Sequence, residues 1–348
     1  MKSTIRFCGP ARYQLLSAAA LFQSAVETSV RRALKAPRQP GCNWFFEVGT
    51  EILRGQLSVA FQMGDVNEMR RYLDSFDVNS HGSGLNVTQV SHEKFRGRWF
   101  VPRDIDPRVT VLYLHGGGYS FYPRSYAHLI SLITLAAKSK SFALDYRLTP
   151  ENRFPAQLED ALAAYHWLLQ EGTNPENVIV AGDSAGANLA LALLLALRDA
   201  RIPSPALAVV LSPPTDFEAV RASLRNYRGY DWIDGRMLER WVAWFCDSTE
   251  LGNPLVCPAR ADLRGLPPIY VQAGRSEILF DSIQAFADQA RRQGADVVLE
   301  SWEHMNHVFQ MFAPDVPQSV EALHRIGEVV DAHGRDCARS EVLLGARM

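Results

Sequence analysis

The sequence predicts an α/β fold in which a mainly parallel central sheet is flanked by helices, with a helical region at the N-terminus. From about residue 85 onward, short apolar runs alternate with segments of helical pattern, which is typical of a parallel sheet with helices on both faces. A Gly-Asp-Ser-Ala-Gly pentapeptide at 182–186 and a His-Gly-Gly-Gly tetrapeptide at 115–118 each directly follow such a run. Because functional groups gather at the carboxyl ends of parallel strands, we expect both motifs on one edge of the sheet.

The composition is that of an ordinary globular protein. The chain has 348 residues, of which 47% are hydrophobic and 21% are charged, enough for one large α/β domain with additions or for two domains. A formal net charge of −2 gives no reason to expect a nucleic acid partner. The cysteines are odd in number and lack any C-x-x-C pair: Cys8, Cys42, Cys246, Cys257 and Cys337. We expect free thiols in a reducing, cytoplasmic setting, with no disulfide and no metal site.

Residues 1–80 are expected to form a helical N-terminal cap region. Helical pattern covers most of residues 11–75, with a break at Pro37 and Pro40. The first forty residues are basic, with Glu27 as their single acid, and their apolar run is too short for a bilayer, which needs about 20 apolar residues. We expect the first helix to pack on the main domain. Contact with a membrane surface and a cleaved signal peptide are the alternatives.

Strands and helices are then expected in turn over residues 81–335, the main domain, before a tail at 336–348. The strands are expected at 87–90, 98–101, 109–114, 142–145, 178–181, 207–211, 269–273 and 297–302, and the helices near 126–138, 158–170, 185–198, 281–293 and 320–332. The alternation stops over residues 213–254, which are rich in Tyr, Trp and Phe. We interpret this stretch as an excursion that lies over the site, with core packing as the alternative.

The pentapeptide at 182–186 indicates an exposed serine nucleophile. Its two glycines allow a sharp turn from strand to helix and hold Ser184 at the helix N-terminus, where partial positive charge favours a developing anion. A serine hydroxyl becomes an effective nucleophile when a base takes its proton and an acid orients that base. A histidine and a carboxylate are therefore expected nearby.

His307 is the expected base, because it follows the strand at 297–302 through a short turn; His304 is its rival. Glu277 is the expected acid, because it follows the strand at 269–273. Asp281 is the rival acid, although it fits better as the cap of the next helix.

The tetrapeptide at 115–118 predicts an oxyanion hole. Three consecutive glycines expose backbone N–H groups in a tight loop, and those of Gly117 and Gly118, together with that of Ala185, could hold the oxyanion of a tetrahedral intermediate. A phosphate-binding loop is the alternative, but the run lacks both the G-x-G-x-x-G spacing and a Walker lysine.

The two motifs together resemble the hormone-sensitive-lipase-like branch of the α/β-hydrolases, also called α/β-hydrolase fold-3 esterases, over about residues 95–332. The nucleophile, acid and histidine also follow one another in α/β-hydrolase order. The matching pieces are His115–Gly118, Asp145–Glu151, Phe154–Ala156, Gly182–Gly186 with Asn188, Leu211–Pro213 with Asp216, Gly265–Pro268, and His307–Phe309. The resemblance implies Ser184 as nucleophile, His307 as base, and Gly117, Gly118 and Ala185 as oxyanion donors. It implies a bracing role for His115.

The sequence departs from the family pattern at three positions. Glu277 stands where the family usually has Asp, and Ala187 replaces the usual Gly after the pentapeptide. Tyr122 replaces a glycine common in the family, which we expect to narrow the pocket for the acyl group or the alcohol. The residues expected to contact substrate are Tyr119, Tyr122 and Trp232.

The expected activity is that of a serine carboxylic-ester hydrolase acting on short- to medium-chain esters through an acyl-enzyme. Amidase, carbamate hydrolase or acyltransferase chemistry would use the same residues, and a non-catalytic ligand receptor is a further alternative against which His307 argues. We expect no cofactor. The expected partner is a small-molecule ester, and a homodimer is a further possibility.

Overall fold

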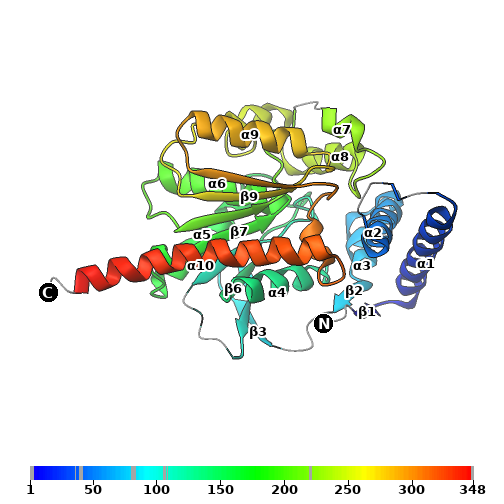
Figure 1. Cartoon of the computed structure of the whole chain (residues 1–348), viewed down its shortest axis with the longest axis horizontal. Helices are drawn as coiled ribbons and strands as arrows, with labels where there is room; N and C mark the ends of the chain where they lie inside the picture. Colours follow the sequence, from blue (N-terminus) through cyan, green and yellow to red (C-terminus); the bar gives the residue numbers. More distant parts are fainter. Residues whose placement is uncertain are drawn as a thin grey trace.

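The described part of the chain is built around an eight-stranded sheet with helices on both faces (Figure 1). The structure, a computed structural model, describes residues 4–35, 37–38, 42–79, 84–104, 107, 109–218 and 222–345; for residues 4, 79, 222 and 334–345 it describes the backbone alone. The strand order is β10-β9-β8-β7-β5-β6-β4-β3. The expectation of a mainly parallel α/β sheet is confirmed.

The strands from β5 to β10 run parallel, and the β3–β4 hairpin adds an antiparallel edge. Their bounds are β3 (Leu85–Ser91), β4 (Arg96–Pro102), β5 (Thr110–Leu114), β6 (Lys140–Asp145), β7 (Val178–Asp183), β8 (Leu207–Leu211), β9 (Ile269–Gly274) and β10 (Val297–Trp302). Central strands such as β5 and β8 are buried along their whole length, which explains why they read as continuous apolar runs.

Two hydrophobic cores lie on opposite faces of the sheet, since successive strand residues point to opposite sides. In β5, Leu112 and Leu114 belong to one core, while Val111 and Tyr113 belong to the other. The first core is covered by α5 (Ala156–Gln170), α6 (Ala185–Asp199) and α9 (Phe280–Arg292), and the second by α4 (Tyr126–Ala136) and α10 (Pro317–Gly345). Helix α10 continues past residue 332, where its predicted end lies, and through most of the segment expected as a tail.

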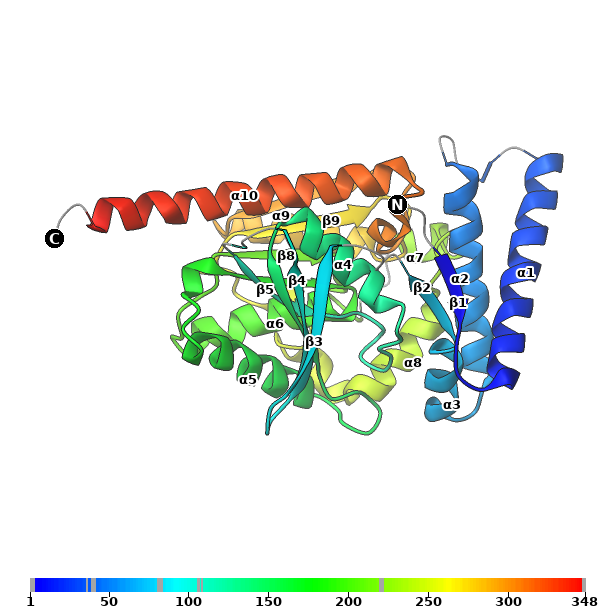
Figure 2. The same ribbon diagram turned by 90° about the horizontal axis from the view of Figure 1, so that it is seen from below.

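The N-terminal region lies at the end of the molecule opposite the C-terminus (Figure 2). It comprises α1 (Ala11–Leu34), α2 (Trp44–Gln62) and α3 (Val66–Leu73), so its predicted helical character is confirmed. The side chains of Asn43 and Asp65 cap α2 and α3 by accepting backbone N–H groups. A small antiparallel sheet of β1 (Thr4–Phe7) and β2 (Phe76–Asn79) was not predicted.

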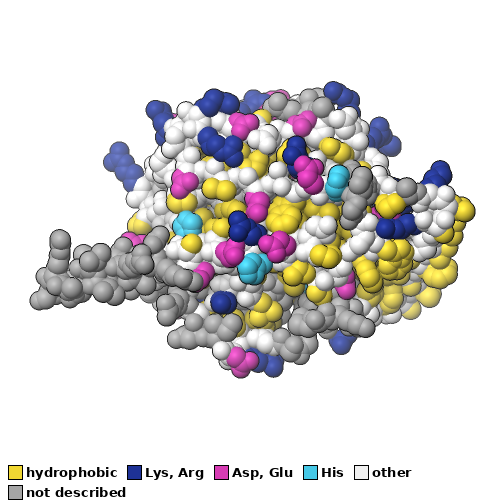
Figure 3. Space-filling model, viewed as in Figure 1, with side chains coloured by type: hydrophobic (Ala, Val, Ile, Leu, Met, Phe, Trp, Pro, Cys, Tyr) yellow, Lys and Arg dark blue, Asp and Glu magenta, His cyan; other side chains and the backbone are white. Residues whose placement is uncertain are grey.

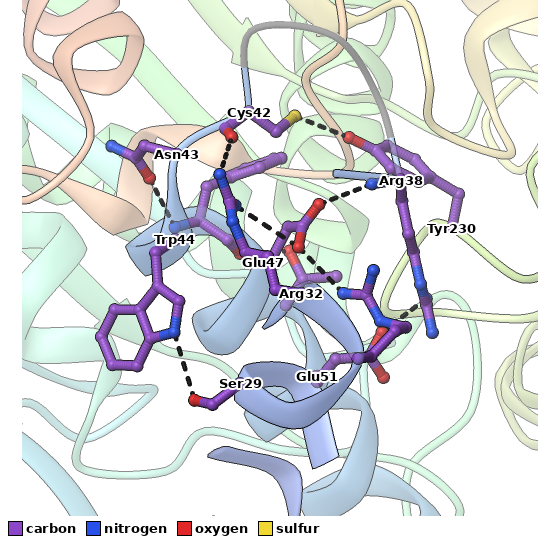
Figure 4. Close-up of polar contacts among 12 residues, drawn as sticks. Ser29, Arg32, Arg38, Cys42, Asn43, Trp44, Glu47, Glu51 and Tyr230 are labelled. Carbon is purple, nitrogen blue, oxygen red and sulfur yellow. Dashed lines mark hydrogen bonds and ion pairs between the residues drawn. The ribbon is translucent and has the colours of Figure 1, made fainter. Parts of the chain in front are cut away.

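A buried carboxylate joins α1 to α2 (Figure 4). Glu47, in the first turn of α2, forms ion pairs with Arg31 at 2.9 Å and Arg32 at 3.4 Å, both from the last turn of α1. Nearby, the Cys42 thiol lies 3.0 Å from the Tyr230 hydroxyl, which links this region to the expected excursion. The N-terminal helices are thus anchored both to each other and to the main domain.

The expected excursion, residues 213–254, is helical over much of its described length. It contains α7 (Ala222–Asn226), α8 (Gly235–Phe245) and the 3₁₀ turn η2 (Ser248–Gly252). Met237, Trp241 and Phe245 recur every four residues along α8 and form its buried face. Further 3₁₀ turns are η1 (Pro175–Asn177), η3 (Pro258–Arg260) and η4 (Phe309–Phe312). Across the described residues, no helix combines the length and hydropathy that crossing a bilayer would require.

Candidate active site

Ser184 stands on a sharp turn between β7 and α6, with a positive φ of 51° and a ψ of −121°. A Cβ on Gly186 would collide with the backbone of Leu114 and His115, and one on Gly182 would lie 2.5 Å from the Gly186 carbonyl oxygen. Only glycine permits so close an approach of strand and helix. The turn therefore holds the serine in a conformation that its neighbours impose.

His307, in the loop after β10, lies within hydrogen-bond reach of the serine. Its Nε2 is 2.8 Å from the Ser184 Oγ, and its side chain is fully buried. The structure thus brings His307, rather than its rival His304, to the serine. Burial alone would lower the pKa of His307, but the Glu277, Asp231 and Asp183 carboxylates together raise it above its ordinary value.

Glu277 is the carboxylate that the structure places against His307. Its Oε2 lies 3.7 Å from His307 Nδ1, and both side chains are fully buried. The Ser212 hydroxyl donates to the same oxygen at 2.6 Å and accepts the Val308 N–H at 3.1 Å, so it bridges the acid and the histidine loop. Asp281 instead accepts the N–H of Ser223 at 2.7 Å. The geometry favours Glu277 as the acid, and a 3.7 Å contact is of the kind that tightens when substrate binds.

The glycine loop after β5 lies beside the serine. Gly117 and Gly118 adopt φ of +92° and +58°, and Cβ atoms there would collide with the Phe121 carbonyl and the Trp241 ring. Both glycines line cavities that contain Ser184. Ala185 is the first residue of α6, so its N–H has no acceptor within the helix and lies at the positive end of the helix dipole.

Asp183 ties this loop to the serine turn. Its buried carboxylate accepts the Gly116 N–H at 3.0 Å and the Tyr113 hydroxyl at 2.8 Å, and burial raises its pKa to about 6. Asp183 immediately precedes Ser184. One side chain therefore ties the glycine loop to the turn that carries Ser184, a contact that the sequence motif did not reveal.

His115 supports the loop from the other side. Its ring is stacked between Tyr122 and Tyr146, at centroid distances of 3.7 and 4.0 Å. Burial lowers its pKa to about 3, so the ring is neutral and its Nδ1–H donates to the Gly116 carbonyl oxygen at 2.7 Å. This contact is consistent with the expected bracing role.

Two small, mostly apolar cavities contain Ser184, with volumes of about 90 Å³ and about 20 Å³. Besides Ser184 they share Gly118, Ile233 and Trp241, so Trp241 borders both cavities. Two larger hollows of about 560 and 480 Å³ do not contain Ser184. Among the described residues, no group of three or more His, Cys, Asp or Glu is placed to hold a metal ion.

Residues 111–311 match the family model described as alpha/beta hydrolase fold. The chain belongs to this family. The α/β-hydrolase is 42% identical to an acetyl-hydrolase of Streptomyces hygroscopicus over 244 residues, which are 70% of this chain and 81% of the relative. It is 32% identical to an esterase of Acinetobacter venetianus over 222 residues, which are 63% of this chain and 73% of the relative.

Solved structures agree with this assignment. An esterase from the bacterial hormone-sensitive lipase (HSL) family matches this α/β-hydrolase with a TM-score of 0.71 at 31% identity, covering 90% of this chain and 98% of that one. EstE5 soaked by ethyl alcohol matches with a TM-score of 0.79 at 30% identity, covering 84% of this chain and 100% of that one. The expectation of a hydrolase of the hormone-sensitive-lipase-like branch is confirmed.

The three residues expected to contact substrate lie in different places in this α/β-hydrolase. Tyr119 lines the 20 Å³ cavity and stacks on Phe245 at 3.9 Å, while Trp232 lines the 90 Å³ cavity and donates its indole N–H to the His307 carbonyl oxygen. Tyr122 lines neither cavity. Its ring packs flat on His115, and it lines the hollow of about 560 Å³ that does not contain Ser184, so the structure does not bring Tyr122 to the cavities beside the serine.

Other cavity walls were missed by sequence reasoning. The 213–254 stretch supplies Ile233 and Trp241, and α2 supplies Leu53, Gln56 and Leu57 to the 90 Å³ cavity. The amphipathic pattern of α8 could have singled out Trp241. No signal in the sequence says that α2 reaches the site, since that depends on how the N-terminal region folds back.

Proposed function

We propose that this α/β-hydrolase is a serine carboxylic-ester hydrolase for short- to medium-chain esters, with acetyl esters the best substrates. The observation that carries the proposal is the 2.8 Å contact between His307 Nε2 and Ser184 Oγ, beside the glycine loop. The names of its relatives, an acetyl-hydrolase and an esterase, support the same reaction class.

The first half of the reaction acylates the serine. His307 Nε2 takes the hydroxyl proton as Ser184 Oγ attacks the ester carbonyl carbon. The carbonyl oxygen becomes an oxyanion that the N–H groups of Gly117, Gly118 and Ala185 stabilise, and losing one such donor typically costs about 3 kcal/mol. The bond to the alcohol oxygen then breaks, that oxygen takes the proton from His307, and the acyl group stays on Ser184.

The second half returns the enzyme to its starting state. His307 takes a proton from water as the water oxygen attacks the acyl carbonyl carbon. The bond to Ser184 Oγ breaks, the proton passes to that oxygen, and the carboxylic acid leaves. The Glu277 carboxylate orients the ring and stabilises the positive charge that His307 carries in both halves.

The size of the cavities supports small acyl groups. A cavity needs about 10–15 Å³ to hold one water molecule, so a cavity of about 20 Å³ admits a group near the size of a methyl. The 90 Å³ cavity offers more room. We assign the small cavity to the acetyl group and the larger one to the alcohol.

A single variant tests the function. Ser184→Ala should reduce kcat on p-nitrophenyl acetate by at least about 10³-fold, because no other group can be acylated. It should also abolish labelling by a fluorophosphonate probe. Ser301→Ala, which alters an exposed serine on β10, is the matched control. Hydrolysis by Ser184→Ala at the wild-type rate would refute the proposal.

The proposal includes a cytoplasmic location. It is supported by the buried, unpaired thiols of Cys42, Cys246 and Cys257, which suit a reducing compartment. Fractionation of cells that express the tagged chain is the test, and recovery outside the cytoplasmic fraction would contradict it.

A further inference from the structure

A second acidic residue, Asp231, lies behind the histidine. It belongs to the turn before α8, and its side chain is only 1% exposed. One carboxylate oxygen accepts the His307 N–H at 3.2 Å and the Trp232 N–H at 2.8 Å, and the other accepts the Ile278 N–H at 2.9 Å. Three backbone amides thus share one buried carboxylate.

These contacts connect the two loops that carry the acid and the base. Ile278 directly follows Glu277, so the Asp231 carboxylate holds the backbone of both catalytic residues at once. Asp231 lies 47 residues from Ile278 and 76 from His307 in sequence. It therefore joins the 213–254 stretch to two separate strand ends.

The N-terminal region holds Asp231 from its other side. The guanidinium of Arg54, on α2, donates to the Asp231 carbonyl oxygen at 2.7 and 3.2 Å and pairs with Glu51 at 2.8 Å. A continuous chain of contacts runs from α2 through Asp231 to the catalytic residues.

Burying a carboxylate without a cationic partner is costly. Burial, together with the Glu277 charge, raises the pKa of Asp231 to about 6, while the nearby His307 and the donated N–H groups of Ile278 and His307 favour the ionised form. A charge kept at such cost, next to a residue that becomes positive during the reaction, points to a role beyond packing.

We propose that Asp231 is a positioning residue for ester hydrolysis. Its carboxylate holds the loops of Glu277 and His307 at a fixed distance from each other, and its contact with Arg54 couples these loops to the N-terminal helices. The inference rests on the proposed function, because it concerns the same site. A misplacement of about 1 Å at such a site can cost about a hundredfold in rate.

The test is the steady-state kinetics of Asp231→Asn over a range of pH. We expect kcat to fall by about a hundredfold with a smaller change in KM. The charges facing His307 are Glu277, Asp231 and Asp183, and each raises its pKa. Since the base must be neutral, removing the Asp231 charge should move the acid limb of kcat/KM to lower pH. A purely structural role would lower activity without moving that limb.

Asp234→Asn is the matched control. Asp234 lies three residues away and caps α8 by accepting the Met237 N–H at 2.9 Å, a role that Asn also fills. Its activity and pH profile should match the wild type. Asp231→Asn with wild-type kcat, or with reduced kcat and an unmoved acid limb, would overturn the proposal.

Arg54→Gln is the second arm, and it tests the coupling of Asp231 to α2 even if Asp231→Asn does not fold. It should lower kcat without preventing labelling of Ser184, and an unchanged kcat would overturn the coupling to α2. A wild-type enzyme that neither turns over esters nor reacts with the fluorophosphonate would instead refute the proposed function.

An independent observation concerns the outer face of α1. Large apolar side chains there are strongly exposed: Leu15 at 72%, Phe22 at 70%, Val26 at 42%, Val30 at 53% and Leu34 at 78%. We call these five residues the α1 stripe. Figure 2 shows α1 at the outer edge of the molecule, and Figure 3 shows hydrophobic side chains gathered at that edge. Exposed apolar patches of this kind mark interaction sites.

The spacing of the α1 stripe suits a helical partner. With the exposed Ala19 included, its members recur at intervals of three or four residues along α1. That is the spacing by which one helix packs against another. Helix α1 has 24 residues, so this face is about 36 Å long.

The charges beside the stripe do not suit a membrane surface. Arg12 pairs with Glu68 at 3.1 Å, and Arg31 and Arg32 pair with Glu47 (Figure 4). Anionic lipids attract clusters of about 4–8 available Lys or Arg. Among the described residues of α1 and its end, Lys35 is a cation without an ion pair, and one lysine does not make such a cluster.

We infer that the α1 stripe packs antiparallel against the α1 stripe of a second copy of this chain. A two-fold axis near the middle of the helix brings apolar residues together and sets the basic C-terminal end of one helix beside the N-terminal end of the other. No two unpaired like charges meet across it, because the arginines are already held by their own chain and the Lys35 residues of the two copies lie at opposite ends of the antiparallel pair.

Sedimentation velocity of the full chain tests this interface. The wild type should sediment as a dimer and Phe22→Glu as a monomer, because a buried carboxylate would face apolar side chains. Val320→Glu, which alters an exposed valine on α10, is the control and should stay dimeric. A monomeric wild type overturns the inference, and so does binding of the wild type to phosphatidylserine vesicles as a monomer.

Discussion

At the scale of single residues, the carboxylates around His307 raise the pKa of its ring. Glu277, Asp231 and Asp183 together raise its pKa above the ordinary value of about 6.5, against the effect of burial. A base must be neutral to accept a proton. Activity should therefore fall as the pH drops through the raised pKa of His307, which lies above 6.5. The dependence of kcat/KM on pH measures this pKa.

Glu277→Gln tests the acid at the same scale. We expect kcat to fall by about 10³- to 10⁴-fold, because the ring loses both its orientation and the charge that stabilises its positive form. The acid limb should move to lower pH for the same reason. Asp281→Asn is the control, since Asp281 binds the Ser223 amide rather than His307. If Asp281→Asn is instead the inactive variant, Glu277 is not the acid.

At the scale of elements, α8 decides the shape of the site. Its Trp241 lines both cavities that contain Ser184, and we expect its ring to divide them. Trp241→Ala should merge them and raise the ratio of kcat/KM for hexanoate over acetate esters by at least about tenfold, since accommodating even one further methylene contributes about 1–3 kcal/mol.

The control for this prediction is Trp244→Ala, on the same helix. Trp244 stacks on Phe61 at 6.3 Å and lines neither cavity. Its chain-length profile, measured with a series of p-nitrophenyl esters, should match the wild type. If neither variant changes the chain-length profile, Trp241 does not divide the two cavities.

Most elements of the main domain follow from periodicity alone. The strand expected at 297–302 coincides with β10, and the one expected at 207–211 coincides with β8. Elements that depend on distant partners were harder to predict. The β1–β2 sheet joins four-residue strands about 70 positions apart, too short to carry a periodic signal.

At the scale of the whole molecule, Glu47 holds the N-terminal region together. It is 4% exposed and pairs with two arginines of α1 (Figure 4). Breaking a buried pair leaves uncompensated charge, so Glu47→Gln should lower the free energy of unfolding by about 3 kcal/mol. Urea denaturation, monitored by circular dichroism, measures this free energy of unfolding.

Glu68→Gln is the comparison for that measurement. Glu68 is 38% exposed and pairs with Arg12, which is 64% exposed. Solvent screens such pairs, so the loss should stay within about 1 kcal/mol. Equal effects of the two substitutions would contradict the anchoring role of Glu47.

The sequence by itself determined the α/β frame, the serine turn and the glycine loop, because each depends on residues close together in the chain. Periodicity predicts the strands and helices, and the glycine motifs predict the sharp turns, even though the close neighbours that require glycine at positions 118 and 186 are distant in the chain. The tertiary structure alone decided which carboxylate faces His307, where Tyr122 packs, and that Asp231, Trp241 and α2 reach the site. These contacts join residues that are tens to hundreds of positions apart in the sequence. The packing of the whole chain sets the distances between them.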